Sequence, residues 1–115
     1  MSNELFGVHG TALALRSQRL AMLASNIANA ATPGYKARDI DFTAAMEAAS
    51  SGLDTGAAAS SATRYRVPVM PSLDGNTVEL STEQTLFAEN AVQYRATLSF
   101  LEGRINTVRR ALKGE

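Results

Sequence analysis

The sequence predicts a mainly α-helical protein, in which an N-terminal and a C-terminal helix pair as a coiled coil beside a flexible middle segment with short extended and turn structure. Three features lead to this prediction. Apolar residues recur at helical spacing near the start of the chain, a heptad pattern runs along its last third, and the residues between are rich in Ala, Ser and Gly. We therefore divide the 115 residues into segments 1–35, 36–80 and 81–115.

The first segment is expected to form a helix from about residue 5 to residue 31, followed by a type II turn. Its large apolar residues recur near helical spacing, but they cover more than half of the helix circumference, and Arg16 and Arg19 fall within the same arc. The sequence Thr-Pro-Gly-Tyr at 32–35 then ends the helix, because Pro33 lacks an amide donor and biases Thr32 away from helical geometry. Pro and Gly also occupy the two central positions that a type II turn favours for them.

The middle segment offers little that a core could bury. Residues 44–63 are mainly Ala, Ser and Gly, which predicts a flexible insert that is disordered in the free chain. Residues 64–69 are expected to be extended, and Pro68 would confine any strand there to the edge of a sheet. A turn is expected at Asp74 and Gly75, shortly before the last helix.

The last helix carries the strongest periodic pattern in the chain. Apolar residues follow alternating steps of four and three positions, which predicts the seam of a left-handed coiled coil. These seam positions are Phe87, Ala91, Tyr94, Leu98, Leu101, Ile105, Val108 and Leu112. The sequence Ser-Thr-Glu-Gln at 81–84 is a candidate capping box at the start of the helix. At 1.5 Å per residue the helix would be roughly 45 Å long, which is too long for a compact fold of this size to cover.

Composition argues against several classes of function. The chain has 11 basic and 11 acidic residues, whereas nucleic-acid binding relies on an excess of positive charge. It contains no Cys and a single His, His9, so neither a Cys or His zinc site nor a catalytic triad can be assembled. We expect no catalytic residue, cofactor, metal ion or small-molecule substrate. No apolar run is long enough to span a membrane, and the first residues do not resemble a cleaved signal peptide.

Four charged residues can be interpreted either as functional residues or as ordinary surface or structural residues. Arg16 and Arg19 either pair with carboxylates across subunits or keep their charges in solvent. Asp39 and Asp41 share a face of an extended segment and could suggest a carboxylate pair for acid–base chemistry, but the sequence shows no pocket that would desolvate them. We therefore do not assign them a catalytic role.

Two Asn and two Tyr residues are likewise open to two interpretations. Asn26 and Asn29 either fix the register between neighbouring subunits through their amides or end the first helix. Tyr35 and Tyr94 either anchor an interface or pack within one subunit, and the position of Tyr94 on the seam favours packing.

Residues 23–36, Leu-Ala-Ser-Asn-Ile-Ala-Asn-Ala-Ala-Thr-Pro-Gly-Tyr-Lys, resemble the N-terminal signature of the flagellar rod and hook proteins. In that family an amphipathic helix with an Asn-x-Ala-Asn element leads into a Thr-Pro-Gly-Tyr turn. The signature residues here are Asn26, Ile27, Ala28, Asn29, Thr32, Pro33, Gly34 and Tyr35. Residues 87–96 are similar to the C-terminal helix of the family, and residues 37–42 and 72–80 point to its proximal rod members.

The resemblance implies a structural subunit of the bacterial flagellar basal body. Such a subunit leaves the cytoplasm through the flagellar type III export apparatus without cleavage of a leader. It self-associates, polymerising into the helical drive shaft that crosses the periplasm. The partners implied are other rod proteins and the adaptor, export-gate and membrane-ring proteins at the base of the rod.

Other functions remain open from the residues. A cytoplasmic helical-hairpin adaptor or chaperone could use the same heptads. Another small flagellar rod protein would share the signature. An enzyme that opens the cell wall is the least supported, because the chain shows no convergent polar cluster.

Overall fold

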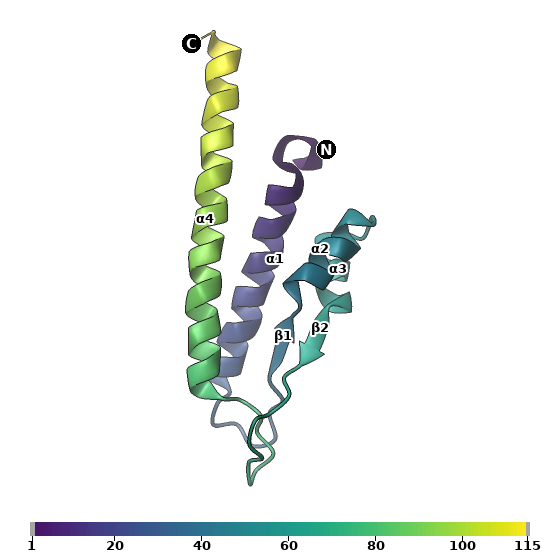
Figure 1. The fold of residues 1–115 in the computed structure, drawn as a ribbon, viewed down its shortest axis with the longest axis vertical. Helices are drawn as coiled ribbons and strands as arrows, with labels where there is room; N and C mark the ends of the chain where they lie inside the picture. Colours follow the sequence, from purple (N-terminus) through teal and green to yellow (C-terminus); the bar gives the residue numbers. More distant parts are fainter. Residues whose placement is uncertain (1, 115) are drawn as a thin grey trace.

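The computed structural model describes the backbone of residues 2–114 and the side chains of residues 7–114. Met1 and Glu115, which belong to the predicted terminal segments, and the side chains of Leu5 and Phe6 lie outside this description. The described chain measures 65 × 26 × 18 Å along its principal axes. Two long helices lie side by side, and a small layer of strands and short helices covers one side of the pair (Figure 1).

Helix α1 spans Ser2–Ala28 and is interrupted near its start. Gly7 adopts φ 56° and ψ −142°, outside helical geometry, so two helical stretches meet at a kink there. The helix ends three residues earlier than predicted. Beyond it, the amide of Tyr35 donates to the carbonyl oxygen of Thr32 at 3.2 Å, and Gly34 has φ 75°. These are the hydrogen bond and the positive φ that the predicted type II turn requires.

Helix α4 spans Leu80–Lys113 and runs antiparallel to α1 (Figure 1). The predicted pairing of the first and last helices is confirmed. The predicted capping box at 81–84 is wrong, because the N-cap is Glu79, which makes no side-chain cap hydrogen bond, and Glu83 is used in a tertiary contact instead. Gly114 ends the helix in the left-handed region with φ 76°.

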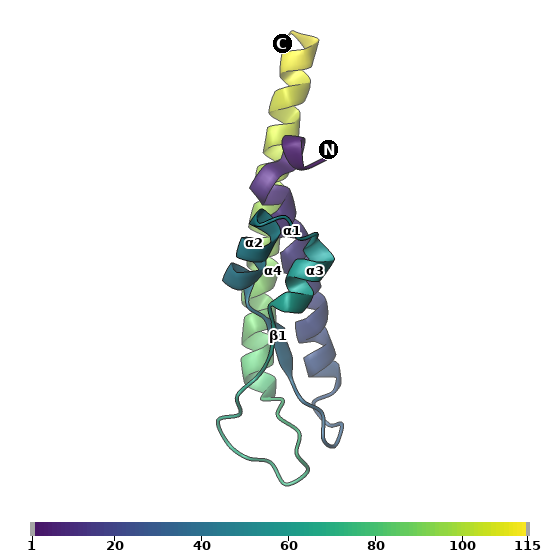
Figure 2. The same cartoon turned by 90° about the vertical axis from the view of Figure 1, so that its right-hand side faces the viewer.

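The middle of the chain is folded. Strands β1, Arg38–Ile40, and β2, Thr63–Tyr65, pair antiparallel, and between them lie helices α2, Phe42–Ser50, and α3, Thr55–Ser61. The prediction that residues 44–63 lack regular structure is therefore wrong. The extended stretch predicted at 64–69 contributes only its first two residues to β2. Figure 2 shows α2 and α3 together on one side of α1.

Alanine explains how this layer forms. Ala has the highest helix propensity, and the carboxylates of Asp41 and Asp54 cap the starts of α2 and α3. Small side chains also let the short helices approach α1 closely. The core cluster consists of Leu15, Ile40, Ala45, Ala59 and Ala62. An alanine-rich segment thus contributes three of the five buried residues of this cluster.

Candidate functional site

The family-signature residue Asn26 lies at the centre of a buried polar network. Its side chain is fully buried, and its Nδ2 donates to the carbonyl oxygen of Arg38 at 2.7 Å and to Oε1 of Glu83 at 2.9 Å. The amide of Arg38 donates in return to Oδ1 of Asn26 at 3.2 Å. One amide side chain therefore ties α1 to β1 and to α4.

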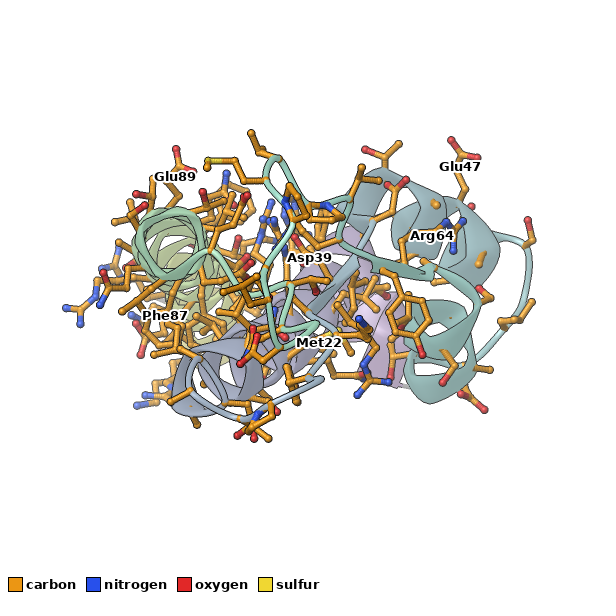
Figure 3. The ribbon with its side chains drawn as sticks, turned by 90° about the horizontal axis from the view of Figure 1, so that it is seen from below. Met22, Asp39, Glu47, Arg64, Phe87 and Glu89 are labelled. Carbon is orange, nitrogen blue, oxygen red and sulfur yellow. The ribbon has the colours of Figure 1, made fainter. Side chains whose placement is uncertain are left out.

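A chain of ion pairs continues from this point across the molecule. Arg66 donates to both carboxylate oxygens of Glu83, at 3.1 and 2.9 Å, and to Oδ2 of Asp39 at 3.2 Å. Arg19 binds the same Asp39 with two hydrogen bonds of 2.8 Å. Figure 3 shows Asp39 between the helix pair and the α2–α3 layer. The alternating charges join α1, β1, the residue after β2 and α4.

The pKa values of Asp39, Arg19 and Arg66 favour their charged forms. Burial alone would raise the pKa of the Asp39 carboxyl, but the hydrogen bonds and charge of Arg19, with smaller contributions from the Ile40 amide and Arg66, lower it below 3.8, its ordinary value. The hydrogen bond to Asp39 raises the pKa of Arg19. The pKa of Arg66 rises despite its burial because Glu83 and Asp39 both contact it. Asp39, Arg19 and Arg66 are therefore ionised at neutral pH.

A second set of polar contacts closes the end of α1. Asn29 donates from Nδ2 to the carbonyl oxygen of Ser25 at 2.8 Å, and Thr32 donates to Oδ1 of Asn29 at 3.0 Å. The buried amide of Asn76 donates to the carbonyl oxygens of Asn29, Ala30 and Thr32, at 3.0, 3.1 and 2.7 Å. Asn29 thus takes part in ending the helix, while Asn26 contacts residues of its own subunit.

The other signature residues surround this helix end. Ile27 is partly buried, and Ala28, Thr32, Pro33 and Gly34 are exposed. Tyr35 bonds through its hydroxyl to Oγ of Ser25 at 3.0 Å, and the same hydroxyl lies 3.5 Å from Oδ1 of Asn26. The turn therefore presents a solvent-facing loop whose only large side chain packs within the subunit.

The predicted seam of α4 is covered along only part of its length. Leu101 is buried, whereas Phe87, Ala91, Tyr94, Leu98 and Ile105 are partly buried. The last two positions, Val108 and Leu112, are 41% and 83% exposed. Two polar residues that the heptad pattern left out, Glu83 and Asn90, are fully buried on the same side of the helix.

Arg16, near the middle of α1, and Asn90, in the first third of α4, join the two long helices. Asn90 donates from Nδ2 to the carbonyl oxygen of Arg16 at 2.9 Å, and Arg16 donates to Oε1 of Gln93 at 2.9 Å. The guanidinium of Arg16 also lies 4.0 Å from the centre of the Phe42 ring, a cation–π contact. Burial and the nearby charge of Arg19 lower the pKa of Arg16.

The loop between β2 and α4 presents a second uncovered apolar surface. Its exposed side chains are Val67, Val69, Met70 and Leu73, each at least 75% exposed. The loop lies at the opposite end of the molecule from the end of α4 (Figure 1). Uncovered apolar side chains therefore occur at both ends of the long axis.

The part of the chain that the structure describes contains no group of three or more His, Asp or Glu side chains arranged to hold a metal ion. Asp41 caps α2 through its carboxylate, which accepts from the amide of Ala44 at 3.1 Å, and Asp39 belongs to the ion-pair chain. The two carboxylates thus have separate structural partners. None of the described helices is long and apolar enough to cross a membrane.

Comparison with known proteins identifies the family. Residues 6–36 match the family described as "Flagella basal body rod protein". A flagellar basal body rod protein FlgB of Cereibacter sphaeroides is 52% identical, over 97% of this chain and 96% of the relative. The FlgB proteins of Aeromonas hydrophila and Escherichia coli K12 are 41% and 43% identical, covering 98% and 89% of this chain and 96% and 88% of their own lengths. The chain therefore belongs to the FlgB family of flagellar basal body rod proteins.

Proposed function

We propose that this protein is a structural subunit of the flagellar basal body rod, where it polymerises with copies of itself and with other rod proteins. The observation that carries this proposal is the end of α4, whose apolar seam continues beyond its partner helix. Relatives over nearly the whole chain are named basal body rod proteins, which supports the same assignment.

The offset between the two long helices explains why the seam is uncovered. Asn26 lies beside Glu83, Arg16 beside Gln93, and the His9 ring 4.3 Å from the Phe100 ring. This antiparallel spacing places Gly7, where α1 kinks, opposite about residue 102 of α4. Val108 and Leu112 lie past that point. Because an apolar seam is stable only when another surface covers it, these residues favour contact with a further chain.

The apolar loop before α4 supports assembly at the other end of the molecule. Val67 and Val69 are 84% and 81% exposed, and Leu73 is completely exposed. Pro68 and Pro71 restrict the backbone between them, so less conformational freedom is lost when the loop binds. We propose that this loop contacts a neighbouring protein of the rod base.

A structural role rather than an enzymatic one follows from how the charged groups are used. Asp39 and Glu83 are held by Arg19 and Arg66 in ion pairs, so both carboxylates already have partners within the subunit. A general acid or base needs a proton-transferring group within reach of a substrate. The wall-opening enzyme is therefore not favoured.

Export and position complete the proposal. We infer that the chain leaves the cytoplasm through the flagellar type III apparatus without leader cleavage. It then takes its place in the periplasm-spanning rod, beside adaptor, export-gate and membrane-ring proteins. Family membership supports this route. The competing functions are a cytoplasmic helical-hairpin adaptor and another position within the rod.

Purified hook–basal bodies from the source bacterium test the proposal. We expect mass spectrometry to detect the chain with its N-terminal residues retained, and deletion of the gene to abolish rods and motility. Absence of the chain from the particle, together with a soluble cytoplasmic pool, would favour the adaptor. Detection of the chain in another part of the rod would change only the position proposed for it within the rod.

A further inference from the structure

A groove opens between the start of α1 and the side of α2. Gly7, Val8 and Thr11 line it from α1, and Met46, Glu47, Ala49 and Ser50 line it from α2. Its volume is about 440 Å³. An apolar cavity of roughly 150 Å³ holds benzene, so the groove has room for more than one aliphatic side chain. Val8 remains 60% exposed at its edge.

Helices α2 and α3 beside the groove carry, together with their capping residues, only acidic charges. Between positions 41 and 63 the chain carries Asp41, Glu47 and Asp54, and no Lys or Arg. All three carboxylates are exposed, and Glu47 lies on the groove itself. Figure 3 shows Glu47 at the outer edge of the molecule, directed away from the ion-pair chain. An apolar segment flanked by basic side chains would fit this surface.

The uncovered end of α4 is an apolar segment flanked by basic side chains. Residues 102–113 contain one acidic residue, Glu102, and a net charge of +3, from the basic residues Arg104, Arg109, Arg110 and Lys113. Val108 and Leu112 are four residues apart and so lie on one face of the helix. An amphipathic helix that places such anchors in a groove is a common recognition mode.

We propose that the groove of one copy receives the end of α4, with Val108 and Leu112, from a second copy of this chain. The net charges of the two surfaces, −3 for residues 41–63 and +3 for residues 102–113, are complementary. Helix α2, which lines the groove, and the end of α4 lie on opposite sides of α1 (Figure 1), so a single copy does not close the contact on itself. A contact between two different surfaces repeats from copy to copy, as an open helical assembly requires. This inference rests on the proposed function and specifies the contact that it needs.

Disulfide trapping tests the contact, because the chain has no Cys to interfere. Purified full-length Ala49→Cys and Leu112→Cys proteins are mixed and oxidised mildly, and disulfide-linked peptides are identified by mass spectrometry. We expect the mixed disulfide, which joins position 49 of one copy to position 112 of the other, to dominate over the two symmetric links. Ser99→Cys replaces Leu112→Cys in the control, because Ser99 is exposed on the opposite face of α4. The control mixture should not give more of the mixed disulfide than random pairing of the two cysteines would produce.

Charge reversal supplies an independent readout. Glu47→Lys in the groove partner should lower the yield of the mixed disulfide about fivefold at low salt, and Arg109→Glu in the helix partner should restore it. A Leu112→Cys protein that links only to itself would overturn the proposal in favour of a symmetric contact. A mixed link no more abundant than in the Ser99→Cys control would also overturn it. In either case, detection of the chain in purified basal bodies would leave the proposed function standing.

Discussion

Asn26 holds three separate stretches of the chain together with one side chain. Its amide contacts the backbone of Arg38 and the carboxylate of Glu83, which is 57 residues away in sequence. The side chains of Asn26 and Glu83 are fully buried. Removing the amide would take away the side-chain partner of the Arg38 backbone and leave Glu83 bound by Arg66 alone, and a buried polar group that loses a partner is costly.

Asn26→Ala should lower the free energy of unfolding by about 2–4 kcal/mol, because several buried hydrogen bonds are lost at once. Urea unfolding followed by circular dichroism measures this change. Asn106→Ala is the matched control, since Asn106 is exposed on α4 and should change stability by less than about 0.5 kcal/mol. Equal effects of the two substitutions would contradict the role assigned to Asn26.

Asp39 makes stability depend on pH in acid. Its pKa is lowered in the folded protein, so the unfolded chain binds the proton more tightly. The stabilisation by Asp39 is therefore present above pH 3.8, the ordinary pKa value, and is lost as the pH falls through the lowered pKa. Asp39→Asn should be less stable at pH 7 and should lose less stability between about pH 4 and about pH 2.

Thermal unfolding measured across that range checks the prediction. Glu102→Gln provides the control, because Glu102 is exposed on α4 and belongs to no ion pair among the described residues. It should keep the acid dependence of the unsubstituted protein. An Asp39→Asn variant with the same dependence would show that the ion pairs do not set stability in acid.

Sequence reasoning singles out Asn26 but not its partners. A periodic pattern does not show which polar residues meet across the fold, and nothing in the sequence connects Asn26 to Glu83. Glu83 fits a capping box locally, since it is the third residue of Ser-Thr-Glu-Gln. A signal is present in the heptad stripe, because Glu83 and Asn90 are each four residues before the apolar positions Phe87 and Tyr94. A polar residue on an apolar face indicates a buried polar contact.

At the scale of elements, the two long helices are predictable because a repeating apolar pattern determines which face is buried. The α2–α3 layer is not. Ala, Ser and Gly carry no strong apolar periodicity, so the sequence of residues 44–63 predicts a lack of structure. The high helix propensity of Ala and the Asp residues at positions 41 and 54 are the local signals for helices. The reason these helices persist is tertiary, since Ala45 and Ala59 are buried in the core cluster with Leu15 of α1.

Leu101 tests the covered part of the seam. Leu101 is only 5% exposed, so Leu101→Asp would place a charged side chain in a buried position against α1. The free energy of unfolding should fall by at least about 3 kcal/mol. Limited proteolysis and urea unfolding of the purified variant measure the loss. A fully stable Leu101→Asp protein would refute the burial of this position.

At the scale of the whole molecule, the fold separates what stabilises the subunit from what remains available for assembly. The ion pairs and the alanine-rich core lie in the middle, while uncovered apolar side chains lie at the two ends. A substitution at an end should therefore affect assembly without affecting the subunit. The sequence predicts the long seam, but only the offset between the helices shows where the covered part ends.

Leu112→Asp should leave the stability of the purified subunit within about 0.5 kcal/mol, because this residue is 83% exposed. The same variant should fail to assemble rods, since a charge would replace an apolar anchor. Swimming assays and electron microscopy of basal bodies, with protein levels checked by immunoblotting, measure this outcome. Normal rods containing the Leu112→Asp protein would show that the end of α4 takes no part in assembly.

The antiparallel pairing of α1 with α4 also sets the order of events during synthesis. The first helix leaves the ribosome long before its partner, because about 50 residues separate the end of α1 from the start of α4. Glu83 and Asn90 form hydrogen bonds with groups of α1, but they are synthesised only with the last third of the chain. Contacts of such large sequence separation form late and slowly. The pairing of the two long helices therefore cannot form until translation is nearly complete, whereas the residues of the core cluster, the last of which is Ala62, are synthesised well before α4.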